Sequence, residues 1–585
     1  MANHHQPWHQ PHRTRDMLLP FAAMLKKYSF ALFKEDALAG IAVAAILTPQ
    51  AIAYAMLAGL PPIAGLYAAL VGAVAAALWG HSQKLSTGPV AIVSFLVFSA
   101  LVPFAAPGST EYVVLAAALA LLSGAILFFL GIFRMGFIMR VIPHTVVIGF
   151  ATAAEIIIII TQIPSLLGFS ASQYEFMLPT MASIAINTVS MQGATVIVGI
   201  ASLVMLIFFK RVSHRIPAEL VVLAIMMAAS YLLQFEHFGI TTVGSIPAVL
   251  PSFEFPALSF TMWLVLLNKA WIIALVGFVG TYAIARSIAS RERIDVDQEL
   301  VGQGMGNIAA GLFHGLPVSG SFSRTAVNIS TGAQTRLASI FAAVIVLLAL
   351  ALIAPIFSFI PLATLSAIVI VAVASAIDLN KMREMYRASR TDGIVAILTF
   401  AIAFILKPDD AVAIGVIVAL ALFMRRIVWA KVRILGIESE WGILQGADAS
   451  AQVETFPGIL MLRIETTAFY GNIESIVRSV DGLITDEESG GNEVRAIVLD
   501  CSSINYVDLS SAETLHEYLA SLHGEGITVY GIYMHGPVIE RLKRVGALSH
   551  ISILHNIQEL RSALALPEKP SGGTENAVQS KDEIG

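Results

Sequence analysis

Charge and cysteine are the two things this sequence has least of. Asp, Glu, Lys and Arg make up only 13% of its 585 residues while 57% are hydrophobic, a balance too apolar for a soluble protein of this length. The single cysteine, Cys501, excludes a disulfide framework and fits a reducing compartment for the part of the chain that contains it. A cleavable signal peptide is not expected, because the His-, Gln- and Arg-rich opening has no continuous apolar core. The scarcity of charge together with the high hydrophobic content indicates a membrane protein.

Fourteen apolar stretches are long enough to cross or half-cross a bilayer. Their approximate bounds are Leu38–Ala58, Ile63–Leu78, Pro89–Pro103, Val113–Ile132, Val146–Pro164, Val196–Phe209, Leu220–Leu233, Ala270–Ile288, Leu300–Phe313, Ser321–Ile329, Ile340–Phe357, Leu362–Ile377, Gly393–Leu406 and Ala411–Phe423.

Basic residues cluster before the first of these spans or after an even-numbered one, and the opposite connections carry almost no Lys or Arg. By the positive-inside rule this pattern places both termini in the cytoplasm, so we expect a multi-pass protein of the cell's inner (plasma) membrane. The clusters are Arg13, Arg15, Lys26 and Lys27; Arg134 and Arg140; Lys210, Arg211 and Arg215; Arg286, Arg291 and Arg293; Lys381, Arg383, Arg387 and Arg390; and Arg425, Arg426, Lys431 and Arg433.

Two spans are short and begin with small and hydroxyl residues. The third follows LSTGPVAIVS (Leu85–Ser94), and the tenth lies within LPVSGSFSRTAVNISTGAQT (Leu316–Thr335), which also holds a lone arginine, Arg324. Seven spans plus seven of opposite orientation make an inverted repeat whose broken helices meet near the midplane. The N-terminus of a restarted half-helix attracts anions. The alternative is that Gly and Pro serve only close helix packing.

After Arg433 the composition becomes that of a soluble protein, and alternating strand and helix patterns predict a small α/β domain. The fold class is therefore an all-α polytopic membrane domain followed by a cytoplasmic α/β domain. We expect segment bounds of 1–35 (cytoplasmic), 36–433 (transmembrane), 434–566 (α/β) and 567–585 (disordered). The expected strands are Gly458–Glu465, Ala496–Ser502 and Gly526–Tyr533, and the expected helices are Ser510–Leu522 and Pro537–Val545.

Motifs for chemistry are missing from the α/β part, which has no Gly-rich phosphate loop, metal-ligand cluster or nucleophile–base pair. We expect a regulatory or assembly module there, and no enzyme, nucleic-acid binder, metal or cofactor in the chain as a whole. The HHQPWHQPH opening is interpreted as a disordered tail and not as a metal-binding tract. Asp295, Asp297 and Glu299 are interpreted as a solvated charge run.

Long motifs in this order resemble the sulfate permease (SulP) family of anion transporters. They are DALAGIAVAAILTPQAIAYAMLAGLPPIAGLYAA (Asp36–Ala69), STGPVAIVS, and QELVGQGMGNIAAGLFHGLPVSGSFSRTAVNISTGA (Gln298–Ala333), followed by a part that looks like a STAS domain. The resemblance implies a core of spans 1 to 4 and 8 to 11 that moves against a gate of spans 5 to 7 and 12 to 14. It also implies a homodimer, and an anion held between the N-termini of spans 3 and 10.

Carried over by position, the resemblance implies a substrate site with Arg324 as its fixed positive charge. Gln50 and Tyr54 alternatively serve helix contacts and packing, and Arg324 alternatively neutralises a buried acid. The implied substrate-binding residues are Gln50, Tyr54, Gly88, Pro89, Val90, Ala91, Phe322, Ser323, Arg324 and Thr325.

One position departs from the family pattern. Proton-coupled members usually carry a glutamate in the eighth span, where GFVGTYAIA (Gly277–Ala285) has Gly280. The fifth span instead holds Glu155, followed by five isoleucines, at a depth where an ionised carboxylate is costly. Glu155 is our candidate for proton binding or coupling; alternatively it is a protonated acid bonded to a neighbouring helix. If Glu155 has no coupling role, the missing acid of the eighth span points to Na⁺ coupling, exchange or uncoupled flux.

In the STAS-like part, Asp508 and Ser510 are placed to cap the helix that begins near Ser511. Ser510 is also a candidate regulatory phosphorylation site, because it resembles the phosphorylated serine of anti-sigma antagonists, although capping explains it as well. A cytoplasmic partner of this domain is expected.

The sequence favours a secondary active transporter of a small anion, sulfate first, that works by alternating access and is coupled to H⁺ or Na⁺. Its alternatives are a bicarbonate or C4-dicarboxylate (succinate, fumarate) transporter, an uncoupled chloride or anion channel, and a non-transporting membrane scaffold that presents the STAS domain. A nucleobase carrier shares the architecture but not the arginine or the STAS-like part.

Overall fold

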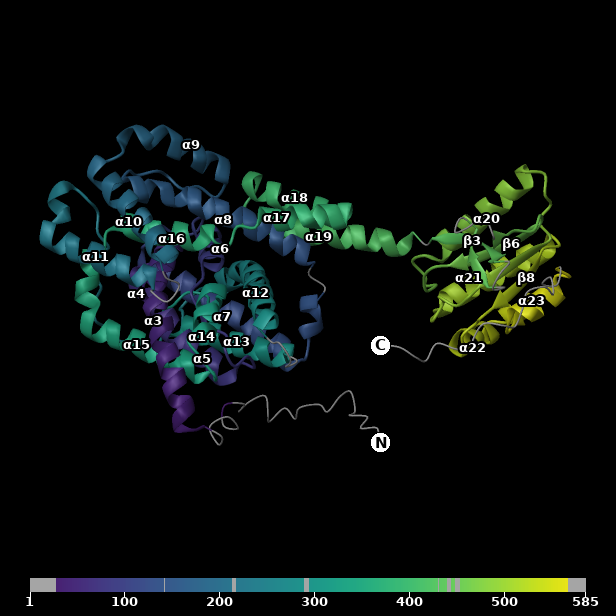
Figure 1. Cartoon of the computed structure of the whole chain (residues 1–585), viewed down its shortest axis with the longest axis horizontal. Coiled ribbons are helices and arrows are strands. Elements are labelled where there is room, and N and C mark those ends of the chain that lie inside the picture. The colour runs from purple at the N-terminus through teal and green to yellow at the C-terminus, as the bar shows by residue number, and fades with distance from the viewer. Residues whose placement is uncertain are drawn as a thin grey trace, which may run out of the picture. The chain divides into compact units, whose positions relative to one another are not determined.

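A computed structural model describes the chain as two compact units, residues 1–419 and 420–585 (Figure 1). The described residues are 21, 28–140, 143–212, 217–288, 294–429, 431–438, 443–447 and 453–566. The histidine-rich opening, the predicted disordered tail at 567–585 and several predicted basic residues, among them Arg215, Arg291 and Arg293, lie outside these ranges.

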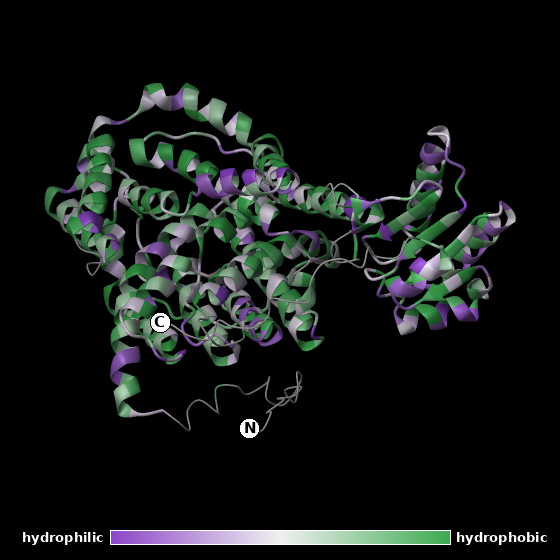
Figure 2. Ribbon diagram, turned by 45° about the vertical axis from the view of Figure 1, so that its right-hand side comes forward, coloured by the Kyte–Doolittle hydropathy of each residue, from purple (hydrophilic) through white to green (hydrophobic). Residues whose placement is uncertain are grey.

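In the described part of the first unit, helices dominate and the named strands are two very short ones. Nine of its described helices are long and apolar enough to cross a membrane. Hydrophobic residues dominate the helices of this unit (Figure 2). The helices are α3 (Phe30–Leu57), α4 (Pro62–Tyr67), α5 (Ala73–Trp79), α6 (Ala91–Leu101), α7 (Thr110–Ile132), α8 (His144–Leu167), α9 (Met177–Asn187), α10 (Gly193–Val212), α11 (Ala218–Leu233), α12 (Phe260–Ile288), α13 (Val296–Leu312), α14 (Phe322–Ser330), α15 (Leu337–Ile353), α16 (Leu362–Ala374), α17 (Leu379–Ala388), α18 (Arg390–Ile405) and α19 (Pro408–Val428).

Every predicted span falls on one of these helices or on a joined pair. The second span is α4 and α5 linked by a π-helical turn, η1 (Ala68–Gly72). The third and tenth are the short helices α6 and α14. Two helices, α9 and α17, were not among the predicted spans, since both are too short to cross a bilayer.

The helices form two groups by their packing. In the first, α7 packs on α13 and α3 on α15; in the second, α8 packs on α16 and α18, and α10 on α16. Glycines permit the closest of these contacts. A Cβ at Gly124 of α7 would lie 2.5 Å from the backbone nitrogen of Ile308 on α13, and one at Gly65 of α4 would lie 1.9 Å from the carbonyl oxygen of Ala51 on α3. Such small-residue contacts let helices associate in lipid by van der Waals packing.

Two short strands cross where the broken helices begin. Strand β1 (Thr87–Gly88) precedes α6, strand β2 (Ser319–Gly320) precedes α14, and the two pair antiparallel. The crossing is extended by a bond from the Ser321 amide to the Ser86 carbonyl (3.0 Å). The two halves of the chain are therefore joined at this point by backbone hydrogen bonds, which a buried backbone requires.

The acidic run at the start of α13 is not a solvated surface, so that interpretation was wrong. Asp295 caps the helix, and Asp297 accepts a hydrogen bond from the Gly136 amide (2.8 Å). Glu299 is only 1% exposed and accepts from the amides of His81 and Ser82 (3.0 and 2.9 Å). A local charge run does not reveal that a distant loop supplies donors.

The second unit is a seven-stranded mixed sheet covered by helices. The strand order is β4-β3-β6-β7-β8-β9 with β5 beside β3, and β6 to β9 run parallel. Three predicted strands match β6, β7 and β8; the other four were not predicted. The elements are β3 (Val432–Glu438), β4 (Leu444–Gly446), β5 (Val453–Glu454), β6 (Ile459–Ile464), α20 (Ile473–Ser489), β7 (Ala496–Asp500), α21 (Leu509–Gly524), β8 (Thr528–Ile532), α22 (Gly536–Arg544), β9 (Ile551–Leu554) and α23 (Ile557–Ala563).

Alternating side chains of β6 divide this unit into two cores. Leu460 and Leu462 pack with residues of α20, α21 and α22, whereas Met461 points to the other face and packs with Leu560 of α23. Cys501 lies in the larger core, where burial raises the pKa of its thiol to about 12, so it remains a protonated, unreactive thiol.

Asp508 begins α21 by accepting a hydrogen bond from the Ser511 amide (2.8 Å), and it also accepts one from the Tyr470 amide (2.8 Å). Ser510 is exposed in the first turn and does not cap the helix. Slight burial acts to raise the pKa of Asp508, but its hydrogen bonds with Ser511 and Tyr470 outweigh this, so the net pKa is lowered.

Replacing Asp508 by Ala should therefore loosen α21 by about 1 kcal/mol, the usual cost of losing an N-cap. Hydrogen exchange of the α21 amides in the full chain measures this. Because the folded pKa is lowered, the cap's contribution is present above the unfolded pKa of about 3.8 and is lost as the pH falls through the folded value. Equal exchange in the Asp508→Ala variant at pH 7 would contradict the capping role.

Candidate functional site

The site is built where α6 begins beside the β1–β2 crossing. The residue before α6, Val90, is extended and no side chain caps the helix, so the first amides of α6 are available to a ligand. Helix α14 begins at Phe322, with the Ser321 hydroxyl accepting weakly from the Arg324 amide (3.5 Å). The positive ends of two helix dipoles thus lie at one crossing, an arrangement that favours a negative charge.

Arg324 supplies a full positive charge at this place and is completely buried. Its Nη1 atom donates to Gln50 Oε1 (3.0 Å) and to the Pro89 carbonyl (2.9 Å). Its Nε and Nη2 atoms have no hydrogen-bond partner among the described residues, and no carboxylate there forms an ion pair with it. Because a buried unpaired charge costs several kcal/mol, an anion next to the two unbonded nitrogens would stabilise this arginine.

Two side chains of α3 border the arginine. Gln50 is 1% exposed and holds the guanidinium through its carbonyl oxygen. Tyr54, one helical turn further, is also buried and lies within electrostatic reach of Arg324. Pro49 precedes Gln50 inside the helix, where it removes one backbone hydrogen bond and so loosens α3 beside the site.

The residues before α6 leave room for the arginine. A Cβ at Gly88 would lie 3.3 Å from Arg324 Nη2 and 3.1 Å from Leu47 Cδ1. Pro89 offers its carbonyl to the guanidinium, while Val90 and Ala91 form the uncapped start of the helix and are partly exposed.

The remaining predicted residues of α14 have different surroundings. Phe322 and Ser323 are exposed in its first turn, and the Ser323 hydroxyl lies 3.3 Å from that of Ser321. Thr325 is buried, and its hydroxyl accepts a hydrogen bond from the Ser86 amide (3.0 Å). Thr325 thus holds the segment before α6, and its hydroxyl is engaged there.

The sequence matches the model of the sulfate permease family over residues 33–399 and that of the STAS domain over residues 450–560. The chain belongs to the sulfate permease family. As a permease it is a multi-pass membrane transport protein, in agreement with its apolar helices.

Named relatives of this permease come from plants and bacteria. A chloroplastic sulfate transporter 4.1 of Arabidopsis thaliana is 32% identical over 517 residues, which cover 86% of this chain and 75% of the relative. A probable sulfate transporter of Mycobacterium tuberculosis is 31% identical over 548 residues, covering 93% of this chain and 97% of the relative.

Solved structures share the fold of the permease. The murine Solute Carrier 26 family member A9 anion transporter, in the inward-facing state, superposes with a TM-score of 0.86 at 21% identity, covering 96% of this chain and 97% of that one. The transmembrane domain of a cyanobacterium bicarbonate transporter gives a TM-score of 0.57 at 25% identity, covering 67% of this chain and 99% of that one.

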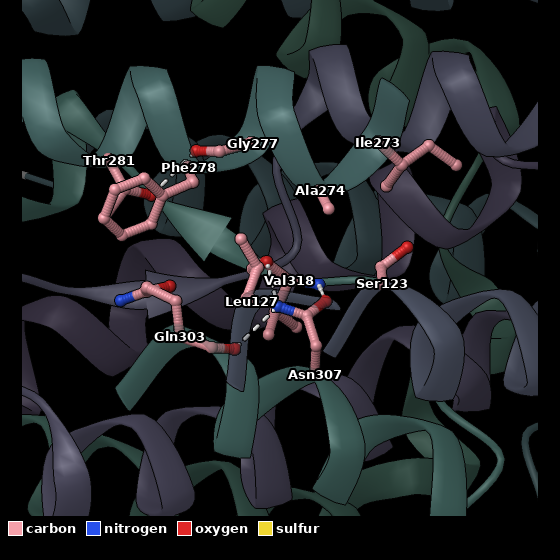
Figure 3. Close-up of a pocket in the computed structure, with 10 residues that line it drawn as sticks. All are labelled: Ser123, Leu127, Ile273, Ala274, Gly277, Phe278, Thr281, Gln303, Asn307 and Val318. Carbon is pink, nitrogen blue, oxygen red and sulfur yellow. Dashed lines mark hydrogen bonds between the residues drawn. The ribbon is translucent and has the colours of Figure 1, made fainter. Parts of the chain in front are cut away.

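Residues that the sequence did not single out hold β2 of the permease in place (Figure 3). Asn307 of α13 donates to the Gln303 and Val318 carbonyls and accepts from the Val318 amide, each at 2.9 Å. Thr281 of α12 accepts from the Gly320 amide (2.9 Å). A buried amide on a membrane helix is the signal that could have found Asn307, because such groups need partners.

The two positions of the coupling hypothesis lie on different helices. A Cβ at Gly280 of α12 would meet no atom within 4 Å, so this position is open space. Glu155 is buried in α8, and its Oε2 atom has no hydrogen-bond partner among the described residues. Among the described residues, no hydrogen bond or ion pair joins Glu155 to Arg324, and the open space at Gly280 has no atom of Arg324 within 4 Å.

Replacing Gly88 by Val should displace the Arg324 guanidinium, because the new side chain would overlap its Nη2 atom. A displacement of about 1 Å can cost on the order of 100-fold in a positioned site, so we expect apparent anion affinity to fall at least tenfold. Uptake kinetics measure this. Gly193→Val is the control, since no atom lies within 4 Å of that position; equal losses in both variants would contradict the account.

Proposed function

We propose that this permease is a secondary active transporter of a small inorganic oxyanion, with sulfate as the first candidate. The observation that carries the proposal is Arg324, a fully buried cation with two nitrogen atoms unbonded and without a carboxylate partner among the described residues. Adjacent guanidinium donors suit the oxygens of a planar or tetrahedral oxyanion. The names of the sulfate-transporting relatives support the choice of sulfate.

Transport proceeds by alternating access, as core helices move against gate helices. On α14 the residues Phe322, Ser323, Ala326 and Ser330 are exposed along one face, whereas no residue of α6 is exposed. The positive-inside pattern places the C-terminal end of α14 on the cytoplasmic side. The exposed face of α14 supports an anion path that opens toward the cytoplasmic side.

The protein acts in the cell's inner (plasma) membrane, with both termini and the STAS domain in the cytoplasm, as a homodimer. It moves its substrate without a chemical step, and H⁺ or Na⁺ is the coupling ion. The STAS domain serves regulation through a cytoplasmic partner, with Ser510 as an exposed candidate for phosphorylation.

A second candidate is uncoupled anion flux, and the observation that favours it is the open space at Gly280. Bicarbonate is the alternative substrate for a coupled carrier, supported by the likeness to a bicarbonate transporter's membrane domain.

The test uses the purified full chain in liposomes loaded with unlabelled sulfate. Labelled sulfate should enter by counterflow, and excess sulfate should compete better than bicarbonate, fumarate or chloride. Imposed pH and sodium gradients then identify the driving ion. Absence of counterflow, or entry only of chloride down its gradient, would contradict the proposal.

A further inference from the structure

Among the residues of the membrane unit whose burial the structure describes, four acids are buried, and three of them have partners. Asp36 accepts from the amides of Gln334 and Thr335 (2.8 and 3.0 Å). Glu219 pairs with Lys210 (3.1 Å), and Glu299 accepts from two loop amides. These contacts account for the three acids as structural groups.

Glu155 is the exception. It is 7% exposed, its Oε2 atom has no hydrogen-bond partner, and no ion pair joins it to a described residue. Ionised here it would be a buried charge without compensation, which costs several kcal/mol. An unsatisfied buried group of this kind needs an explanation.

Among the described residues of the neighbouring helices, no charged group forms a hydrogen bond or an ion pair with it. Helices α6, α9 and α16 contain no titratable residue. Lys269, further inside α12, has a partner of its own. The remaining titratable groups on the helices around α8 lie in the first or last two turns of their helices: His144 on α8 itself, Lys210 and Arg211 on α10, Tyr282 and Arg286 on α12, Lys381, Arg383, Glu384, Tyr386 and Arg387 on α17, Arg390 and Asp392 on α18, and Asp409, Asp410, Arg425 and Arg426 on α19.

Glu155 lies on the least buried stripe of α8. Val147, Ala151 and Ile159, which precede and follow it at intervals of four residues, are partly exposed. Another side of the helix is fixed against α18, because a Cβ at Gly149 would lie 2.2 Å from the Ala396 carbonyl oxygen. Helix α8 also packs on α6, whose N-terminus borders the anion site. Movement of α6 relative to α8 would therefore change the packing of the helix that carries Glu155.

We propose that Glu155 is the proton-binding group that couples anion transport to the pH gradient. It lies on α8, whereas the position that lacks an acid, Gly280, lies on α12. The carboxylate takes up one proton when displacement of the core opens the stripe to water. It remains a neutral acid while the stripe is closed, and it releases the proton when movement of the core opens the stripe toward the other side of the membrane. This inference rests on the proposed function, since it assigns the coupling of that same anion site.

The test compares wild type with Glu155→Gln in liposomes that contain a pH-sensitive dye. Wild type should admit protons together with sulfate and should accumulate sulfate under a pH gradient. Glu155→Gln should keep the rate of sulfate counterflow within about twofold of wild type, because the anion site is intact. It should admit no protons, and its sulfate accumulation under a pH gradient should be at least tenfold lower. Glu219→Gln, which removes an acid that already has a partner, should keep accumulation.

Accumulation by Glu155→Gln equal to wild type would overturn the inference, and so would loss of counterflow in a monodisperse variant. Glu155→Asp keeps the acid and should keep proton entry; sulfate exchange without protons in that variant would also count against it. Sulfate entry without protons in wild type would refute the coupling role and leave the proposed function standing, whereas absent wild-type counterflow would refute the proposed function itself.

Discussion

Uptake of labelled sulfate should fall to background when Arg324 is replaced by Ala. Truncating one member of a buried, hydrogen-bonded charge pair costs about 2–5 kcal/mol, and each 1.4 kcal/mol is a factor of ten in affinity. The loss of apparent affinity should therefore lie between about 30-fold and 3,000-fold. Uptake kinetics in liposomes, with the variant shown to be monodisperse, measure it.

Two further substitutions separate charge from geometry at this position. Arg324→Gln keeps hydrogen-bonding capacity but not charge, and should be nearly as inactive as the alanine variant. Arg324→Lys keeps the charge without the planar fork, so it should retain weak transport with poorer discrimination among oxyanions. Normal uptake by Arg324→Gln would mean that the arginine does not compensate the substrate's charge.

Replacing Asn307 by Leu should destabilise the membrane unit and abolish uptake. The substitution leaves the amide and carbonyl of Val318 without their bonds to Asn307, and Val318 is buried. Each unsatisfied buried group costs about 1–3 kcal/mol. The strand β2 would also lose the contact that fixes it before α14. The sulfate uptake rate should therefore fall more than the drop in Tm alone would predict.

Asn187 provides the matched control for this experiment. Its side-chain amide also donates to a helix carbonyl four residues earlier, that of Ser183 (2.8 Å), but in the short helix α9. Asn187→Leu should therefore change neither Tm nor uptake appreciably. If Asn307→Leu retained wild-type uptake, β2 would not need its connection to α13.

The membrane helices could be predicted from the sequence because long apolar runs separated by basic loops are local signals. A small α/β domain could be predicted from alternating strands and helices for the same reason, whereas its assignment as a STAS domain came from the resemblance to a known family. The fold class is confirmed by the family matches and the neighbouring structures. Four strands of the α/β domain, including β3 and β9, were missed because they are short or come before the regular alternation starts.

Contacts between distant segments could not be predicted from local pattern. The β1–β2 pairing joins residues 87 and 320, and nothing near either one specifies the register. The same limit explains the wrong interpretation of Glu299, whose donors are His81 and Ser82. For Arg324, the sequence indicates an isolated cation in lipid, but which of its nitrogens remain unbonded depends on where Gln50 and Pro89 lie.

The most direct test of the anion site is a structure of the full chain determined with selenate, a heavier analogue of sulfate. The account predicts a bound oxyanion between the first turn of α6 and Arg324, with its oxygens within hydrogen-bond distance of the Nε and Nη2 atoms. An oxyanion bound elsewhere in the membrane unit, with those two nitrogens still without a ligand or paired with a carboxylate, would contradict it.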